Sequence, residues 1–137
     1  MIDHERLQHA VKHTKRRNCI GTALYLTHCV STDDYIDPDD FDQFLEPYLP
    51  RQEQPTLGCL VSFHDSDPTS PFLGDTQHMA VVTKLNPLLL THRKNYEKPV
   101  EEHIPSERIT ENTQNKPGLK QLSIKHYYTP TALHSLP

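Results

Sequence analysis

A cysteine and a histidine lie in this sequence where a thiol nucleophile and its base could be placed. Cys19 follows Asn18, a residue that can cap a helix, and it begins an apolar segment that runs to Val30. In the first turn of a helix, the unpaired backbone N–H groups and the helix dipole favour the thiolate over the thiol. His78 opens a second apolar segment after a long polar stretch, so an imidazole there could accept the thiol proton.

This pair of residues predicts a reaction in two stages on the carbonyl of an amide bond. Cys19 attacks the carbonyl carbon, His78 protonates the leaving amine, and water then hydrolyses the thioester. We assign Cys19 as the nucleophile and His78 as the general base and acid. The residues at the start of the helix, Asn18 and Cys19, are the candidates for stabilising the oxyanion through N–H groups.

A third residue would orient the ring of His78, and His92 is the candidate on the next expected strand. If the turn between the two strands is centred on position 86, His92 lies opposite Ala80 and diagonal to His78, within reach of its side chain. If the turn is centred on position 87, His92 lies opposite Val82, which is too far from His78. Asn95 falls on the other strand face in either register and is the weaker candidate.

The remaining cysteines and the other histidines are better explained by structure than by chemistry. Cys29 and Cys59 are expected to be inert, buried side chains, and three cysteines do not make a disulfide framework. His9 and His13 are spaced for one face of a helix, but no acidic or cysteine ligand stands at a useful spacing. The aspartates of segment 33–42 lack the glycine and glutamate of an EF-hand loop. We therefore expect no metal ion and no other cofactor.

The elements that would position these side chains follow from the spacing of apolar residues. Helical spacing predicts a first helix over 3–16 and a buried one from Cys19 to Val30. Asp37 and Pro38 predict the start of a third helix that turns three apolar side chains to the core: Phe41, Phe44 and Leu45. Alternating patterns predict strands over 57–63, 78–85, 88–94 and 122–126, the second and third of which form a hairpin. Residues 97–118 are polar and interrupted by proline, which predicts an irregular surface segment.

The composition limits the class of protein. A chain of 137 residues, 34% of them hydrophobic, predicts one domain over residues 1–137. A formal net charge of −4 argues against nucleic acid as a partner, because binding phosphates needs a basic surface. No segment is apolar over the roughly 20 residues of a membrane span, and the first residues lack the pattern of a secretory signal. The expected location is the cytoplasm, or outside the cell by a route that needs no signal peptide.

Three segments resemble the NlpC-type family of papain-like cysteine peptidases and, more loosely, the CHAP amidases. Residues 18–25, Asn-Cys-Ile-Gly-Thr-Ala-Leu-Tyr, are similar to the Asp-Cys-Ser-Gly motif that carries the nucleophile of the family. Residues 57–63, Leu-Gly-Cys-Leu-Val-Ser-Phe, resemble its Gly-Asp-Leu-Val-Phe-Phe strand. Residues 78–82, His-Met-Ala-Val-Val, resemble its His-Val-Gly-Ile-Tyr strand. The three segments come in the same order as in the family.

The resemblance covers residues 18 to about 95 and implies an α+β fold of the papain-like NlpC type. N-terminal helices would pack on a small antiparallel sheet, and the third catalytic residue would lie on the second hairpin strand, as His92 does. Family members cleave bonds in bacterial cell-wall peptides, so a cysteine peptidase or amidase acting on a peptide or peptidoglycan-like substrate is implied. The chain departs from the family pattern at Asn18 and Cys59, where Asp is usual, and at Ile20, where Ser is usual.

The sequence is also compatible with other functions. Relatives with this architecture act as deamidases or acyltransferases on protein substrates, and the fold alone does not choose among these reactions. The chain could also be a non-catalytic relative that binds a protein partner through its acidic segment and loops. A pocket in which Cys19 does not approach His78 would favour the non-catalytic alternative.

Overall fold

The structure is a computed structural model that describes residues 2–114 and 121–133. The chain begins with helices α1 (His4–Lys12), α2 (Cys19–Leu26) and α3 (Pro38–Asp40), the last of which continues into a π-helical turn, Phe41–Leu45, and a 3₁₀ turn, Glu46–Tyr48. The strands are β1 (Arg51–Gln52), β2 (Leu60–Asp65), β3 (Thr76–Lys84), β4 (Leu89–Arg93), β5 (Val100–Pro105) and β6 (Leu122–Tyr128). Helix α4 (Ser106–Gln114) lies between β5 and β6 in the chain.

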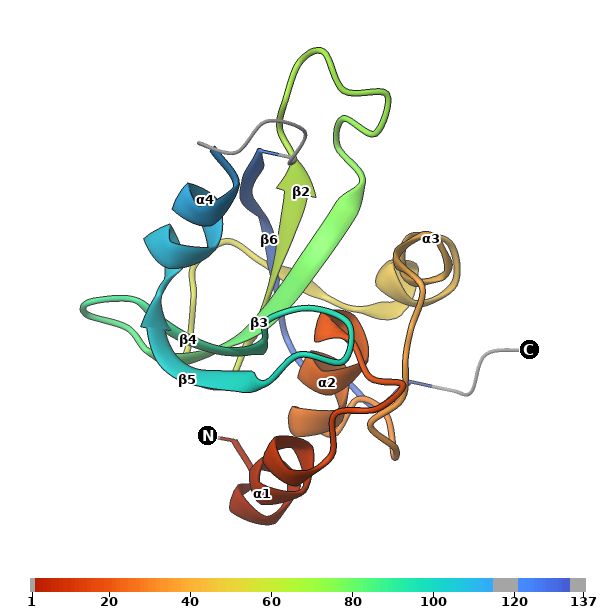
Figure 1. Cartoon of the computed structure of the whole chain (residues 1–137), viewed down its shortest axis with the longest axis vertical. Coiled ribbons are helices and arrows are strands. Elements are labelled where there is room, and N and C mark those ends of the chain that lie inside the picture. The colour runs from red at the N-terminus through yellow and green to blue at the C-terminus, as the bar shows by residue number, and fades with distance from the viewer. Residues whose placement is uncertain (1, 115–120, 134–137) are drawn as a thin grey trace.

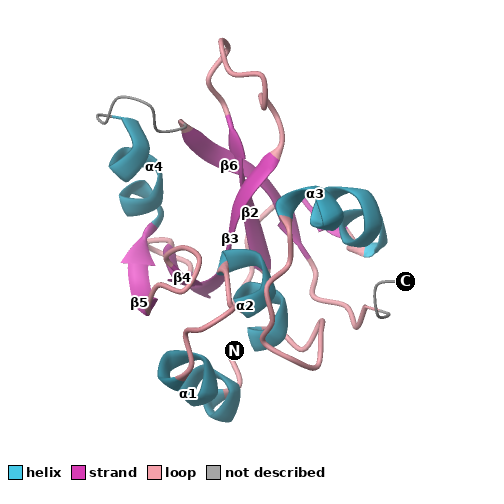
Figure 2. Cartoon of the chain, turned by 45° about the vertical axis from the view of Figure 1, so that its right-hand side comes forward, coloured by secondary structure: helices cyan, strands magenta, loops and turns pink. Residues whose placement is uncertain are grey.

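The strands form one antiparallel sheet in the order β1-β6-β2-β3-β4-β5. The last described strand, β6, lies inside the sheet between β1 and β2, so it pairs with segments from the middle of the chain. Helices α2 and α3 lie to one side of the sheet and α4 to the other (Figures 1 and 2). The protein therefore has a mixed α+β architecture with helices against an antiparallel sheet, as the sequence predicts.

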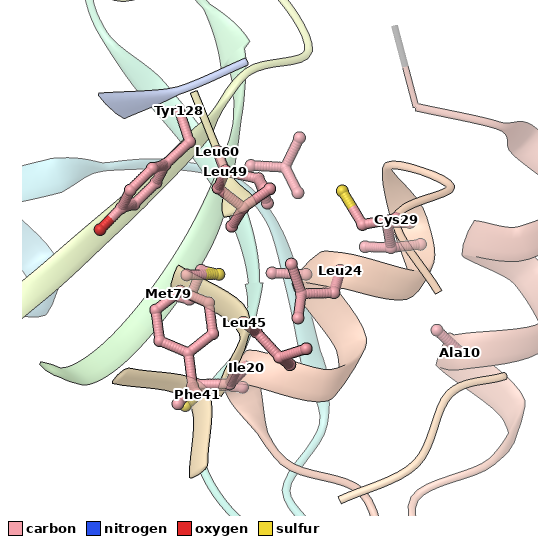
Figure 3. Close-up of a cluster of buried hydrophobic side chains, with 14 residues drawn as sticks. Ala10, Ile20, Leu24, Cys29, Phe41, Leu45, Leu49, Leu60, Met79 and Tyr128 are labelled. Carbon is pink, nitrogen blue, oxygen red and sulfur yellow. The ribbon is translucent and has the colours of Figure 1, made fainter. Parts of the chain in front are cut away.

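The larger apolar core lies between α2 and the sheet (Figure 3). Ile20 and Leu24 of α2 pack in it with Met79 of β3 and Tyr128 of β6. Phe41 joins them from the π-helical turn and meets the Tyr128 ring edge-on, with ring centroids 6.4 Å apart. Nearly all residues of α2 are buried, because other parts of the protein pack against all of its faces. This explains why its sequence is apolar on all faces.

A second apolar cluster fills the opposite face of the sheet beneath α4. Ala80 and Val82 of β3 pack there with Leu90 of β4 and Ile109 of α4, whereas Met79, between them in sequence, faces α2. Successive side chains of β3 therefore enter different cores. A strand that is buried on both faces is apolar throughout, and this accounts for the unbroken apolar run that follows His78.

The helices are shorter than their sequence patterns predict. α1 ends at Lys12 and α2 at Leu26, not at residues 16 and 30. After α2 the backbone of His28 is left-handed, with φ 62°, and the Cys29 N–H donates to the Leu24 carbonyl at 2.9 Å. This hydrogen-bonded reversal ends the helix and turns the following residues away from its axis.

The third helix begins as predicted, but one of its side chains points the other way. Asp37 caps the helix by accepting a hydrogen bond from the Asp39 N–H at 2.8 Å, and Pro38 is its first residue. Phe41 and Leu45 are buried, whereas Phe44, predicted to face the core, is 40% exposed. The π-helical turn, with its wider spacing, changes the phase of the helix at this point and brings positions 41 and 45 inward instead of 44.

The prediction of an irregular surface segment over residues 97–118 is wrong for most of its length. Residues Val100–Pro105 form β5 at the edge of the sheet, and Ser106–Gln114 form α4, while residues 115–118 lie outside the described part of the chain. β5 buries only Ile104, and on the described turns of α4 only Ile109 is buried. One apolar contact per element is too weak a pattern to identify from sequence.

The other strands appear where alternation predicts them. The hairpin of β3 and β4 and the final strand β6 are confirmed, and β2 begins three residues later than expected, at Leu60. Among the residues that the structure describes, no helix combines the length and the apolar character needed to cross a membrane.

Candidate functional site

Two histidines and a glutamate form a hydrogen-bonded chain across three neighbouring strands. The Nε2 atom of His78 on β3 lies 2.6 Å from Nδ1 of His92 on β4. The Nε2 atom of His92 lies 2.9 Å from Oε1 of Glu101 on β5. The sequence predicted the first of these contacts but not the second.

The register of the sheet brings these side chains together. Val81 pairs with Thr91 and Val82 with Leu90, which is the register predicted to place His92 level with Ala80. The rings of His78 and His92 then meet edge-on, with centroids 4.8 Å apart. On the far side, His92 pairs directly with Glu101, so their side chains share one face of the sheet.

The carboxylate at the end of this chain fixes where the protons lie. An ionised Glu101 can only accept, so Nε2 of His92 carries the proton that is donated to it. Neutral His92 is then an acceptor at Nδ1, and Nε2 of His78 donates to that atom. The lone pair of His78 is consequently on Nδ1, the position from which a general base would act.

Burial keeps both histidines neutral. His78 is only 6% exposed, and burial, followed by the proximity of His92, lowers the pKa of His78 to about 3. Burial also lowers the pKa of His92, although the hydrogen bond that His92 donates to Glu101 acts in the opposite direction. At neutral pH the His78 ring therefore carries no charge, and in this closed arrangement it is a weak base.

Cys19 lies beside the backbone that carries His78. Its sulfur donates to the carbonyl oxygen of Gln77 at 4.0 Å, and the backbone of Met79 also hydrogen-bonds to it. The pairing of β3 with β4 ends at Val81 and Thr91, so β4 is not paired with β3 at this point. The first turn of α2 contacts β3 where this pairing stops, which brings the nucleophile candidate next to the base candidate in the fold.

The thiol of Cys19 is protonated and sheltered from solvent. Cys19 is 6% exposed, and burial raises its pKa to about 11 even though backbone N–H groups at the start of α2 act to lower it. The expected thiolate at the helix N-terminus is therefore not the resting state, because loss of hydration outweighs the helix terminus. Within the described residues, no hydrogen bond joins the sulfur to the His78 ring.

Asn18 is occupied by structural hydrogen bonds. Its Oδ1 accepts from the N–H groups of Gly21 and Ile36, both at 3.1 Å, and its Nδ2 donates to the Ile36 carbonyl at 2.7 Å. The predicted N-cap is thus confirmed, and the side chain also clamps the segment that follows α2. Any oxyanion donor at this helix terminus would be a backbone N–H and not the Asn18 amide.

Two loops cover the segment that leads into Cys19. The loop after α2 bonds to it through the Tyr35 N–H and the Arg16 carbonyl, 2.9 Å apart. The loop between β4 and β5 bonds to it through Glu97, whose N–H donates to the Arg17 carbonyl at 2.8 Å and whose side chain accepts from the Arg16 N–H at 3.0 Å. The rings of Tyr35 and Tyr96, 5.5 Å apart, join the two loops to each other.

A buried arginine holds these loops and helices in place. Arg93 is fully buried, and its guanidinium donates to the Ala10 carbonyl at the end of α1, to Thr22 of α2, and to the Lys98 carbonyl in the β4–β5 loop, each at 2.8 Å. The carboxylate of Asp33 lies 3.3 Å from the same guanidinium and compensates its charge. One side chain thereby connects α1, α2, β4 and the loop next to Cys19.

A cavity of about 390 Å³ opens beside the two histidines. Its described lining consists of His78, His92, Lys94, Asn95, Lys98, Pro99, Glu101, Ile104, Arg108, Ile109 and Leu122. Cys19 is not among these residues. Asn95, the weaker alternative to His92, lines the cavity as well, but it makes no hydrogen bond to His78 among the described residues.

The described residues contain no cluster of side chains that could bind a metal ion. The rings of His9 on α1 and His13 just after it lie with centroids 4.4 Å apart, tilted by 40° to each other. No group of three or more potential ligands occurs among the described residues. Cys29 and Cys59 are each 1% exposed, and burial raises their pKa values, as expected for core side chains.

Glu101 is the residue of the candidate site that the sequence did not reveal. It stands next to Glu102 in a polar segment, and only the pairing of β4 with β5 distinguishes the two. A predicted strand over 100–105 paired with the strand of His92 would have pointed to Glu101. The charged residues of this edge strand hide the alternation that would predict it.

Comparisons with protein-family models, curated proteins and solved structures found no match to this chain.

Proposed function

We propose that this protein is a thiol hydrolase of papain-like NlpC type that cleaves an amide or peptide bond. The observation that carries the proposal is the chain of hydrogen bonds from His78 to His92 and Glu101, set beside the helix that begins with Cys19. Packing alone would not call for two buried histidines that lose hydration and are joined in series to a partly exposed carboxylate. Such a chain suits a base whose free nitrogen must be held in one position.

In the proposed reaction, the proton moves as the sulfur attacks. The Cys19 sulfur bonds to the substrate carbonyl carbon while its proton passes to Nδ1 of His78, and the carbonyl electrons move to oxygen. His92 and Glu101 stabilise the imidazolium that forms. Collapse of the oxyanion breaks the C–N bond, and the amine leaves with the proton from His78. Water then attacks the thioester carbon and gives up a proton to His78. The second oxyanion collapses with cleavage of the C–S bond, the carboxylic acid product leaves, and His78 returns the proton to the Cys19 sulfur.

The burial of Cys19 sets a requirement on substrate entry. A thiol that is 6% exposed cannot meet a peptide carbonyl unless the covering segments move. The loops that carry Tyr35 and Tyr96 are the segments to move, because they are held to each other by one ring contact and to residues 16 and 17 by a few hydrogen bonds.

Alkylation of the full chain with iodoacetamide tests the nucleophile without knowledge of the substrate. Opening of the loops that cover Cys19 would expose its sulfur at the start of α2, so we expect mass spectrometry to find Cys19 modified well before Cys29 and Cys59, which are each 1% exposed. Because the resting thiol has a pKa of about 11, the rate at Cys19 should rise roughly tenfold per pH unit between pH 7 and pH 10. Equal, slow modification of all three cysteines would contradict the proposal.

Hydrolysis is tested with peptides and peptidoglycan fragments, by product analysis and by the intact mass of an acyl-enzyme. We expect Cys19→Ala and His78→Asn to abolish turnover and Cys29→Ala to retain it. Transfer of the acyl group to an added amine in place of water would identify an acyltransferase, and release of ammonia from a glutamine side chain would identify a deamidase.

A second candidate, a non-catalytic binding domain, is favoured by one observation. Cys19 is buried and does not line the cavity beside the histidines, so the cavity could bind a ligand without any reaction at sulfur. A Cys19→Ala variant that keeps full ligand binding, in a protein that shows neither turnover nor selective alkylation, would support this candidate.

A further inference from the structure

We propose that the cavity beside His78 and His92 binds an anionic group carried on a short aliphatic chain. As a binding site this stands on the cavity alone, and as a determinant of substrate choice it rests on the proposed hydrolase function. The cavity adjoins the proposed base, so whatever fills it lies next to the reacting bond.

The charges around the cavity favour an anion. Lys94, Lys98 and Arg108 contribute three cationic side chains, and Glu101 is the one carboxylate among the described lining residues. Glu101 already accepts a hydrogen bond from His92 at 2.9 Å. The described lining of the cavity carries more positive than negative side chains, whereas the whole chain has a formal net charge of −4.

No carboxylate among the described side chains neutralises the three cations. Among residues 2–110 and 121–133, no carboxylate lies within ion-pair distance of Lys94, Lys98 or Arg108. Burial lowers the pKa of His92, which also lines the cavity, and Glu101 acts to raise it. The charges of Lys94 and Arg108 make smaller contributions that lower it. Like charges that converge on one cavity repel one another, and a bound anion relieves that repulsion.

Part of the cavity lining is aliphatic. Ile104 of β5 and Ile109 of α4 are 5% and 6% exposed, and they line the cavity with Leu122 of β6. A ligand that suits both kinds of lining has an alkyl part that contacts these side chains and an anionic end that meets the cations. At about 390 Å³ the cavity lies near the lower end of the range of roughly 300–1,000 Å³ for small-molecule sites. It therefore fits one side chain or one short acyl chain.

The shared chemistry is an anion, and a carboxylate or a phosphate could supply it. Three probes of matched length separate these sources from neutral binding. They are the mono-N-methylamide of adipic acid, its neutral diamide, and 5-phosphonopentanoic acid N-methylamide. Each carries the same alkyl chain and the same amide, so only the terminal group differs.

Titration of the ¹⁵N-labelled full chain, followed by amide chemical shifts, gives affinity and location together. We expect the carboxylate or the phosphonate to bind at least about tenfold more tightly than the diamide. The shifts should centre on residues 92–109, and affinity should fall with added salt. Equal binding of all three probes, or shifts centred elsewhere, would overturn the proposal.

Single neutral substitutions test the cations themselves. Lys98→Met and Arg108→Met should each weaken binding of the favoured anion by roughly threefold to tenfold and leave the diamide unaffected. Lys84→Met, at the exposed end of β3, is the matched control and should change neither. Loss of diamide binding in parallel with anion binding would show that the substitutions act on the fold and not on charge, which would contradict the proposal.

The two proposals fail separately. Anion binding that persists in Cys19→Ala, without any turnover in the wild type, would leave the cavity as a ligand site and remove the hydrolase. Turnover of acidic and neutral substrates at equal kcat/KM would leave the hydrolase and remove the cavity as its determinant of specificity.

Discussion

Glu101 determines which nitrogen of His78 is free to act as a base. It does so through His92, without touching His78, because each neutral imidazole in the chain can donate at only one nitrogen. Glu101 is in this sense a positioning residue, and its charge also favours the protonated form of the histidines during a reaction.

Replacing Glu101 with Gln removes that charge and keeps the size of the side chain. We expect turnover, or alkylation of Cys19 where no substrate is known, to slow by on the order of 100-fold. The pKa of His92 should fall further, because the hydrogen bond and charge of Glu101 now act to raise it. An NMR titration of the histidine rings measures this directly.

Glu102→Gln is the matched control for this substitution. Glu102 is the next residue on β5 but faces a different cavity, which it lines with His103. We expect it to change neither the rate nor the titration of His92. A Glu101→Asp variant should recover part of the rate, and equal loss in Gln and Asp variants would point to packing in place of charge.

At the scale of single elements, the start of α2 is fixed by a glycine. A Cβ atom at Gly21 would collide with the backbone carbonyl of Asp34, in the loop after α2. The loop can approach the helix so closely only because position 21 has no side chain.

Gly21→Ala should therefore destabilise the protein, by roughly 1–3 kcal/mol, because the loop must shift away from the helix. The sign is informative, since alanine inside a helix normally gains about 1 kcal/mol over glycine. Urea denaturation measures the change. A stabilised Gly21→Ala variant would show that the loop does not pack against α2 as described.

Arg93 links the helices to the sheet, and its loss should be severe. In Arg93→Met the Asp33 carboxylate loses one of its two arginine partners, and the carbonyls at the end of α1 lose their donor. We expect the free energy of unfolding to fall by about 3–5 kcal/mol. Arg51→Met, which breaks an ion pair with Glu46 whose arginine side chain is 55% exposed, should cost less than about 1 kcal/mol. Comparable losses in both variants would contradict the central place of Arg93.

At the scale of the whole molecule, the neutral histidines make folding sensitive to acid. The pKa of His78 is about 3 in the folded protein and near 6.5 when the ring is exposed in the unfolded chain. The unfolded state binds a proton between these values and the folded state does not. The stability that His78 contributes is therefore complete above pH 6.5 and is lost as the pH falls toward 3.

Thermal unfolding at pH 7, 6, 5 and 4 tests this linkage. The wild type should lose stability steadily over this range, and His78→Asn should lose less, because Asn does not take up a proton. His4→Asn, at an exposed position on α1, is the control and should follow the wild type. Parallel curves for all three proteins would show that His78 is not held neutral by the fold.

The sequence predicted those parts of the molecule that local patterns determine. The cap at Asn18 and the hairpin that carries His78 and His92 depend on neighbouring residues, and both were recovered. Phe44 was misplaced because a π-helical turn changes the phase that a regular helix would keep. Glu101 was missed because its role depends on an edge strand that shows little apolar alternation.

The state of Cys19 was beyond sequence reasoning for a different reason. A helix N-terminus predicts a reactive thiolate, but its effect on the thiol depends on how much water remains around the sulfur. Here the packing of segments distant in sequence removes that water and raises the pKa to about 11. The local sequence predicts where the helix begins, but the hydration of the Cys19 sulfur depends on the tertiary fold.

The place of the Cys19 sulfur at the end of the β3–β4 pairing has a mechanical consequence. The Gln77 carbonyl and the Met79 backbone of β3 hydrogen-bond to this sulfur, at a level of the sheet where β4 does not pair with β3. These two peptide groups therefore hold the first turn of α2 against β3 through the Cys19 sulfur. In the proposed reaction α2 would stay in place against β3, and the surface loops that meet at Tyr35 and Tyr96 would move to admit a substrate.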